Sequence, residues 1–368
     1  MTTPLVLVGE AYGTNEARIS APFVGASGVE LLRMMADAGM LTLTRADLSN
    51  ISSYWRHFQP SAIAAVWRAH ATEVFRTNVF NFHPKDNDIT QVGGPAATAL
   101  PGYPALIKGR YVRAEFRPEL ERLADELAHH NPNLVVCLGN TPLWALTGSV
   151  GIKKLRGTTL VSSHCIAGFK LLPTYHPAAV LRQWELRPLV IADLRKAKRE
   201  LASPGTTWTR REIWVEPTLA DLEEFGTKYI QGCRLLSVDI ETSGRLITCV
   251  GFAPSADRAL VVPFYDERRN GRSYWPTHTD ETAAWRFVKT VLERPELPKL
   301  FQNGLYDITF LYRAMNIRVM GAQHDTILLH HALQPAALKD LGTLGSLYAN
   351  EGAWKADRRY TRTIKRDE

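Results

Sequence analysis

The sequence predicts an α/β protein made of two domains, and three observations lead to this fold class. From Pro4 to about Ala202, short apolar segments alternate with longer amphipathic ones, as in a parallel sheet covered by helices on both faces. The turn-forming segment SPGTT, which begins at Ser203, then interrupts the alternation. Beyond it, two apolar strands follow each other across a Ser-Gly turn, so they must be antiparallel, and the second sheet is expected to be mixed.

The first domain is expected to have three layers, with a parallel sheet between two layers of helices. Each expected strand is a short apolar run, and each expected helix repeats its apolar residues at helical spacing. The strands are expected at Leu5 to Gly9, Val74 to Phe80, Leu134 to Leu138 and Lys170 to Pro173. The helices are expected at Gly28 to Ala38, Pro60 to His70, Arg117 to His130, Pro142 to Thr147 and Arg187 to Glu200.

The second domain begins with an expected helix at Leu219 to Tyr229. Strands are expected at Leu235 to Ile240 and at Ile247 to Phe252. We therefore place a first domain at 1–202, a linker at 203–208, a second domain at 209–354 and a tail at 355–368. The tail is dense in charge, which is typical of a poorly ordered segment.

Length, charge and cysteine content narrow the classes of function. The chain has 368 residues, more than one ordinary domain contains, and its net charge of +7 indicates a polyanionic partner such as DNA. A merely soluble basic protein is the alternative on charge alone. The four cysteines form no CxxC pair or zinc-like cluster, and there is no signal peptide or membrane-spanning run. We therefore expect a cytoplasmic protein without a membrane partner.

The first strand runs into a loop that concentrates polar and aromatic groups. It leads into the segment GEAYGTNEARISAPFVGASG, after which an apolar-periodic segment begins. A strand, a glycine-rich loop and a helix in this order form the usual ligand site at the carboxyl edge of a parallel sheet. Because a plain connection needs neither acids nor an aromatic ring, Glu10, Glu16 and Phe23 are candidate site residues.

Two further segments, TNVFNFHPKDND and LLPTYHPAAVLR, follow expected strands and are expected at the same sheet edge. Phe23 offers a flat apolar face, Asn78 can read the edge of a base, and His176 can stabilise negative charge on a leaving group. Glu10 or Glu16 could orient a water or stabilise a cationic sugar. This set suits cleavage of an N-glycosidic bond, in which an oxocarbenium-like sugar and an anionic base must both be stabilised.

Together the three segments resemble the uracil-DNA glycosylase superfamily, in the branch with a GExPGxxE…PFVGxxG loop and a distant HP motif. The segments PNLVVCLGNTPLWALTG and LRG (Leu155 to Gly157) add to the resemblance, which covers the first domain and is strongest to versions carried by bacteriophages. The resemblance implies a hydrolase that removes uracil from single- or double-stranded DNA without a cofactor. It also implies that Phe23 stacks on the flipped uracil, Asn78 reads its polar edge, and His176 hydrogen-bonds its oxygen.

The resemblance assigns the remaining site residues as well. Glu16 would support the water or the sugar cation, Glu10 would help to hold the loop, and Asn87 would assist. Close backbone approach to DNA would involve Gly9, Gly13 and Gly25. The residues that would contact DNA beside the pocket are Arg156, Gly157, Pro177 and Arg182, together with Val180 and Leu181 as candidate wedges for the space that the base vacates.

The sequence departs from the family pattern at two positions. Tyr12 replaces the usual proline, and a bulky residue beside the pocket could alter which bases enter. Phe82 stands where one would expect a cysteine of the iron-sulfur cluster that much of this branch holds. We therefore predict that this chain holds no iron-sulfur cluster.

The second domain carries a pattern of acids that is typical of a metal site. In SVDIETSG, Asp239 and Glu241 lie two apart on a strand and so share one face. Neighbouring carboxylates repel each other unless a cation lies between them, and such hard ligands select Mg²⁺ or Mn²⁺. Downstream, FQNGLYD places Asn303 and Asp307 one helical turn apart, and Asp325 follows in HDT.

These acids resemble the proofreading 3′-5′ exonuclease domains of bacterial and phage polymerases, which have an RNase H-like fold. The resemblance makes Asp239, Glu241 and Asp307 metal ligands and leaves Asp325 beside the site. The family's third motif, a Tyr or His followed four residues later by Asp, is absent, since the nearest candidate, Tyr360, is followed by Ile364. We therefore expect weak exonuclease activity or none from this chain alone.

The sequence supports three hypotheses. The first is a uracil-DNA glycosylase whose second domain binds the strand or a DNA polymerase. The second is a non-catalytic module that holds single-stranded DNA. The third is the amino-terminal piece of a split phage polymerase, in which another polypeptide completes the proofreading domain.

Overall fold

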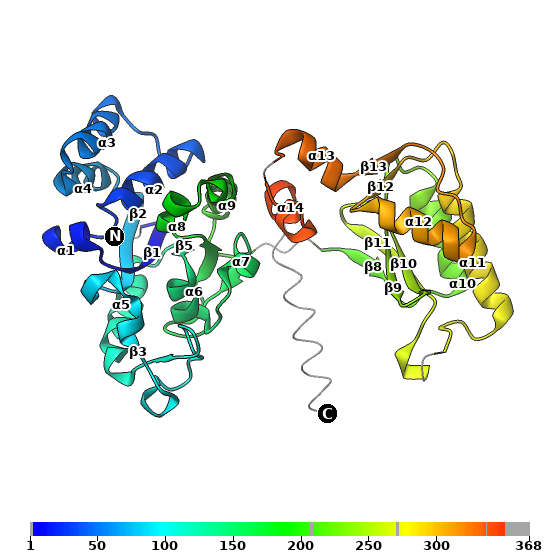
Figure 1. The fold of residues 1–368 in the computed structure, drawn as a ribbon, viewed down its shortest axis with the longest axis horizontal. Coiled ribbons are helices and arrows are strands. Elements are labelled where there is room, and N and C mark those ends of the chain that lie inside the picture. Colours follow the sequence, from blue (N-terminus) through cyan, green and yellow to red (C-terminus); the bar gives the residue numbers. More distant parts are fainter. Residues whose placement is uncertain (1–2, 207–209, 270–271, 336, 350–368) are drawn as a thin grey trace. The chain divides into compact units, whose positions relative to one another are not determined.

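The computed structural model describes residues 3–206, 210–269, 272–335 and 337–349, which form two compact units (Figure 1). One unit contains 3–206 and 342–349, and the other covers 210–341. The division falls within the expected linker at 203–208. Helix α14 (Leu341–Tyr348) differs from the expectation, because from Gly342 onward it groups with the first unit, where the Ser346 hydroxyl accepts a hydrogen bond from Arg156 at 2.7 Å. The expected tail at 355–368 lies outside the described residues.

A five-stranded sheet in the order β2-β1-β5-β7-β6 forms the centre of the first unit. The sheet confirms the expected parallel arrangement, since its first four strands run in the same direction. The short edge strand, which runs antiparallel to its neighbour, was not expected from the sequence. The strands are β1 (Leu5–Ala11), β2 (Val74–Phe80), β5 (Leu134–Leu138), β7 (Lys170–Thr174) and the edge strand β6 (Leu160–Val161).

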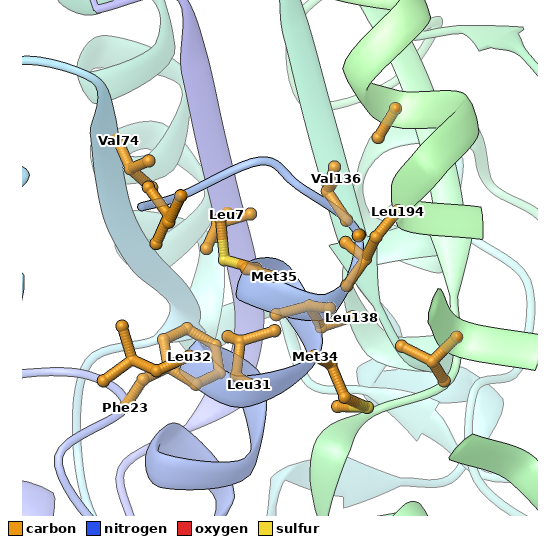
Figure 2. Packing of buried hydrophobic residues seen from close by; sticks show 14 of the residues in the cluster. Leu7, Phe23, Leu31, Leu32, Met34, Met35, Val74, Val136, Leu138 and Leu194 are labelled. Carbon is orange, nitrogen blue, oxygen red and sulfur yellow. The ribbon is translucent and has the colours of Figure 1, made fainter. Parts of the chain in front are cut away.

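Two hydrophobic cores lie on opposite faces of this sheet and create the three layers. Along β1, Leu5 and Leu7 join one core while Val6 and Val8 join the other, as alternation along a strand requires. Helices α2 (Ala26–Asp37) and α9 (Arg187–Glu200) pack on the first face, and α5 (Arg117–His130) and α6 (Asn140–Thr147) pack on the second. Figure 2 shows the first core, in which residues of α2 pack against residues of the sheet.

Several helices of the first unit were not expected. Helix α1 (Thr14–Ile19) interrupts the predicted opening loop, α3 (Arg45–His57) precedes the expected α4 (Pro60–Ala69), and α8 (Pro177–Arg182) follows His176. Helix α3 begins with a capping box, in which the Thr44 and Asp47 side chains each accept a hydrogen bond from the other residue's backbone N–H. The residue types at these two positions are the sequence signal that would have predicted this helix.

Arg156 and Gly157 were expected to contact DNA. In the structure Arg156 belongs to a buried ion pair with Asp193, and Gly157 lies beside that ion pair. The Arg156 guanidinium donates to both carboxylate oxygens of Asp193, at 2.7 and 3.0 Å, and Thr174 donates to the same carboxylate at 2.7 Å. Gly157 has a φ of +69°, and a Cβ there would lie 2.6 Å from an Asp193 oxygen. These two residues therefore stabilise the interior, since a buried charge needs its partner.

The second unit has a mixed sheet in the order β13-β12-β9-β10-β11-β8, as expected. The central strands β9, β10 and β11 are antiparallel neighbours, and the outer strands pair in parallel. The strands are β8 (Glu212–Trp214), β9 (Leu236–Ser243), β10 (Leu246–Ser255), β11 (Arg258–Pro263), β12 (Lys299–Phe301) and β13 (Gln323–Asp325).

Helices pack on this second sheet around a single core cluster. They are α10 (Leu219–Phe225), which continues as a π-helical turn over Gly226–Ile230, then α11 (His278–Leu292) and α12 (Gly304–Met315). Helix α13 (Thr326–Leu333) follows β13 and contributes no residue to this core. Helix α10 falls where the sequence predicts a helix. In the described part of the chain, no helix has the length and apolar character to cross a membrane.

Candidate active site

The carboxyl ends of the parallel strands of the first unit surround a cavity of about 570 Å³. All three segments singled out in the sequence contribute side chains to its wall, which confirms that they meet at one edge of the sheet. The predicted site residues that line it are Glu10, Tyr12, Gly13, Glu16, Phe23, Asn78, Asn87, His176 and Arg182.

Glu16 fixes the shape of the opening loop. One of its carboxylate oxygens accepts hydrogen bonds from the backbone N–H groups of Val24, at 3.1 Å, and Gly25, at 2.7 Å. Gly25 is the N-cap of α2, so the carboxylate lies at the positive end of that helix. Glu10 was expected to help hold the loop, and these contacts show that Glu16 does so as well.

Gly9 leaves the space in which the side chains of two site residues lie next to β1. A Cβ at this position would lie 2.4 Å from the Asn78 side-chain oxygen and 2.6 Å from the edge of the Phe23 ring, both closer than real contacts allow. Gly13 and Gly25 are similarly close to the Glu16 carboxylate. The glycines therefore make room for protein side chains, while close approach to DNA stays a prediction.

Phe23 is held in an unusual backbone conformation at the base of the cavity. Its φ is +57°, and its carbonyl accepts a hydrogen bond of 2.8 Å from the Trp67 indole. The side chain is 4% exposed and belongs to the first core, so the ring cannot rotate freely (Figure 2). Its centroid lies 6.1 Å from that of the His176 ring. The ring thus lines the cavity with a flat apolar surface at a fixed position, and stacking on a nucleobase stays a prediction.

Asn78 presents a buried amide whose nitrogen has no hydrogen-bond partner among the described residues. Its backbone is fixed from behind, because Arg122 donates to the carbonyl oxygens of Asn78, at 2.8 Å, and Val79, at 3.0 Å. Leaving a buried donor unpaired costs about 1–3 kcal/mol, so such a group in a cavity wall is a strong indication of a ligand.

His176 lies across the cavity at the start of α8. Its Nδ1 accepts a hydrogen bond of 3.1 Å from the backbone N–H of Ala178. Burial, together with the nearby charge of Arg182, lowers the pKa of His176 to about 4. The imidazole is therefore neutral at pH 7, and because Nδ1 accepts, its proton is on Nε2, which can donate to a ligand.

Glu10 remains the acid that is not committed to the loop backbone. It lies near the end of β1, and one of its oxygens accepts a hydrogen bond from the Thr141 hydroxyl. Burial raises the pKa of Glu10, whereas the bond from Thr141 and the charge of Arg182 act in the opposite direction. Asn87, on the far side of the loop, has a φ of +56° and its side-chain oxygen lies 3.1 Å from Nε2 of His83.

The segment after His176 differs from its expected role. Val180 is fully buried and Pro177 is also buried, so neither side chain is exposed to a ligand in this structure. Leu181 is 41% exposed, and Arg182 is exposed at the cavity mouth. Of the two candidate wedges, Leu181 is therefore the exposed one, and its role as a wedge stays a prediction.

The second unit gathers the predicted metal ligands only in part. Asp239 and Glu241 are exposed on one face of β9, where they alternate with buried Val238 and Ile240. Asp307 lies in the first turn of α12 and accepts a hydrogen bond of 3.0 Å from the backbone N–H of Ile240. Burial, and then repulsion from Asp239, raises the pKa of Asp307 to about 6.

Asp325 has a structural role. Its carboxylate accepts hydrogen bonds from the backbone N–H groups of Gly304 and Ile327, at 2.7 and 2.8 Å, at the starts of α12 and α13. Asn303, just before α12, has a φ of +65°. Within the described ranges, no three His, Cys, Asp or Glu side chains are gathered as a metal ion requires. The acids thus form no closed metal centre, and Tyr360 and Ile364 lie outside the described residues.

Residues 1–201 match the protein-family model described as the uracil DNA glycosylase superfamily. The chain belongs to the uracil DNA glycosylase superfamily. A type-4 uracil-DNA glycosylase of Thermotoga maritima is 25% identical over 209 residues, which cover 56% of this chain and 81% of that protein. The type-4 enzyme of Sulfurisphaera tokodaii is 28% identical over 210 residues, which cover 56% of this chain and 73% of that protein.

A match of a different kind extends beyond the glycosylase region. A DNA polymerase of Bacillus phage SP01 is 23% identical over 258 residues, and the match covers 63% of this chain but 27% of the polymerase. Among solved structures, the chain is similar to RNase D of Trypanosoma brucei, with 20% identity, a TM-score of 0.27 and coverage of 33% of this chain and 40% of that chain. This TM-score is low, so the similarity carries no weight for the function of the second unit.

The position of the expected iron-sulfur cysteine is occupied by an aromatic stack in this glycosylase domain. The rings of Phe82 and Phe116 lie 5.7 Å apart at an angle of 21°, and Phe80 packs against both. Aromatic side chains offer no thiolate to iron, so these residues do not fit a cluster. The lack of a cluster in this chain stays a prediction.

The low pKa of His176 predicts how the stability of the fold and the protonation of the imidazole respond to acid. Because the folded-state pKa of about 4 lies below the ordinary value of 6.5, the shift stabilises the fold above pH 6.5, and this stability is lost as the pH falls from 6.5 through about 4. We expect the ¹⁵N chemical shifts of the imidazole to report a neutral Nε2–H tautomer from pH 8 down to about pH 5. An imidazolium at pH 7 would contradict this assignment.

Proposed function

We propose that the first unit removes uracil from DNA by hydrolysing the N-glycosidic bond of a flipped nucleotide. The observation that carries this proposal is the buried Asn78 amide, whose nitrogen has no partner, in the same cavity as the neutral His176. Membership of the glycosylase superfamily supports the same reaction class. The positive charge of the chain suits a DNA substrate.

The chemistry of uracil matches the groups in the cavity. Its N3–H can donate to the Asn78 carbonyl oxygen while its O4 accepts from the Asn78 amide nitrogen. Nε2–H of His176 can donate to O2, and the ring of Phe23 can stack on the base. These contacts satisfy the polar groups of the base and leave the glycosidic bond directed out of the cavity.

The same groups would stabilise the departing base. As the bond to N1 breaks, the electron pair moves onto the base, and negative charge spreads to O2. A neutral imidazole that donates from Nε2 stabilises this charge in the way that an oxyanion hole does. Glu10 is the carboxylate left to stabilise the sugar cation or to orient the attacking water, with Asn87 at the same cavity wall.

Tyr12 is the residue that we propose to influence which bases enter. It lines the cavity, and its backbone N–H donates to the Phe82 carbonyl at 3.1 Å, which fixes the main chain there. A tyrosine ring at this wall occupies space that the family's proline would leave open. Selection between uracil and other deaminated bases would therefore depend on this side chain.

The decisive experiment is excision of uracil from an oligonucleotide in the presence of EDTA, followed by alkaline cleavage of abasic sites. We expect the wild-type chain to produce such sites, and we expect His176→Ala and Asn78→Ala each to lower the rate by about 10²–10³-fold. His129→Ala is a matched control, because His129 is exposed on α5 away from the cavity. Absence of abasic sites with the wild type, or equal rates for all variants, would refute the proposal.

A second candidate activity comes from the acids of the second unit. We propose that Asp239, Glu241 and Asp307 form an exonuclease-like site that is weak or inactive in this chain alone. Support comes from the hydrogen bond that Asp307 accepts at 3.0 Å from the N–H of Ile240, the residue between Asp239 and Glu241 on β9; repulsion among these acids, which contributes to the raised pKa of Asp307, would be relieved by a Mg²⁺ or Mn²⁺ ion. The similarity to a phage DNA polymerase supports a DNA polymerase as partner or as the source of the missing motif.

This proposal predicts little or no trimming of a labelled 3′ end by the isolated chain with Mg²⁺ or Mn²⁺. The matched variant is Asp239→Asn, which removes one carboxylate charge while keeping the size of the side chain. Efficient trimming by the wild type that is lost in this variant would show that the third motif is not required.

A further inference from the structure

Helix α3 exposes large apolar side chains along the border of its buried face. Trp55 is 40% exposed and Phe58, the residue that ends the helix, is 66% exposed, while Leu48 lies on the same side as Trp55 and is 51% exposed. The adjoining residues Ile51 and Tyr54 pack into the first core. The two aromatic rings thus extend the apolar face of the helix into solvent, where large apolar groups are often part of an interaction site.

Phe58 is also held in a strained backbone conformation. Its φ of 52° and ψ of 44° are left-handed, a conformation that glycine usually supplies at the end of a helix. Its N–H donates to the Tyr54 carbonyl at 2.6 Å, which closes the helix without any help from the exposed ring. A bulky aromatic residue kept in such a position, with its ring in solvent, indicates a use for the ring.

The charges around these rings are positive. The Arg33 guanidinium lies 5.9 Å from the centre of the Trp55 ring, and Arg56 is exposed between the two aromatic residues. The acid on this helix, Asp47, is buried in the capping box at the other end. Aromatic rings can stack on unpaired bases, and neighbouring arginines can contact phosphates. This combination suits single-stranded DNA.

The aromatic end of α3 contacts the loop that carries the cavity residue Glu16. The Tyr54 ring packs edge-on against the rings of Trp55, at 5.4 Å, and Phe58, at 6.2 Å. The Tyr54 hydroxyl accepts a hydrogen bond of 3.3 Å from Asn15, the neighbour of Glu16. A strand that delivers one base to the cavity can therefore place adjacent nucleotides on this surface.

We propose that Trp55 and Phe58 form a stacking platform for unpaired bases next to the flipped uracil, with Arg33 and Arg56 contacting the phosphates. Bases within a duplex are already stacked on each other, so the platform would favour single-stranded DNA. The role of the platform next to a flipped uracil rests on the proposed glycosylase function. Its affinity for single-stranded DNA does not depend on that function.

The test is fluorescence anisotropy with a labelled oligothymidine of about 15 nucleotides, which contains no uracil, and with a duplex of the same length. Phe58→Gly removes the ring while supplying the residue that the left-handed conformation favours, so folding is kept. We expect Phe58→Gly and Trp55→Ala each to raise the Kd for the single strand by about tenfold, and the Kd for the duplex by less than about twofold. Tyr265→Ala, at an exposed tyrosine of the second unit, is the matched control and should bind as the wild type does.

Excision assays separate this proposal from the glycosylase assignment. On a mononucleotide of deoxyuridine, which has no neighbouring base to stack on the platform, both platform variants should keep the wild-type kcat/KM. The platform would be overturned if the wild type bound no single-stranded DNA. It would also be overturned if the platform variants bound single-stranded DNA as tightly as Tyr265→Ala does, which is the result expected if this face binds a protein. If the wild type excised no uracil while the platform variants bound single-stranded DNA about tenfold more weakly than the wild type, the glycosylase assignment alone would be overturned.

Discussion

The cavity of the first unit depends on the absence of a side chain at Gly9. The side-chain oxygen of Asn78 and the edge of the Phe23 ring both lie where a Cβ of residue 9 would point, at distances that a Cβ would forbid. Any larger residue would displace the group that we propose to read the polar edge of the base and the ring that we propose to stack on it. The proposed site therefore places its strictest demand on the strand beside these two groups.

The other constraints hold these two groups in place. The Glu16 carboxylate binds the start of α2 and so fixes the left-handed turn at Phe23, while Arg122 fixes the backbone of Asn78 from behind. Opposite them, burial and the Ala178 N–H keep His176 neutral with its proton on Nε2. The result is a cavity whose donors are oriented before a base arrives, which is the condition for stabilising charge in a transition state.

Much of the fold could be predicted because strands and helices of the first unit follow simple apolar periodicities, and the site because its three segments all follow parallel strands. Contacts across the fold could not be predicted. Nothing in the local sequence shows that Asp193 would bury Arg156, or that Val180 would turn inward, since both depend on partners distant in the chain. The contacts of Glu16 with the backbone of Val24 and Gly25 have the same origin, because they join residues eight and nine positions apart across a turn.

Binding of free uracil tests the central claim most directly, because it needs neither DNA nor catalysis. In ¹H–¹⁵N NMR spectra at pH 7, we expect uracil to shift the Nε2–H signal of His176 and the side-chain amide signals of Asn78, and adenine to leave both unchanged. Shifts confined to residues outside the cavity, or a His176 side chain that carries protons on both nitrogens in the complex, would contradict the assignment of these two residues to the base.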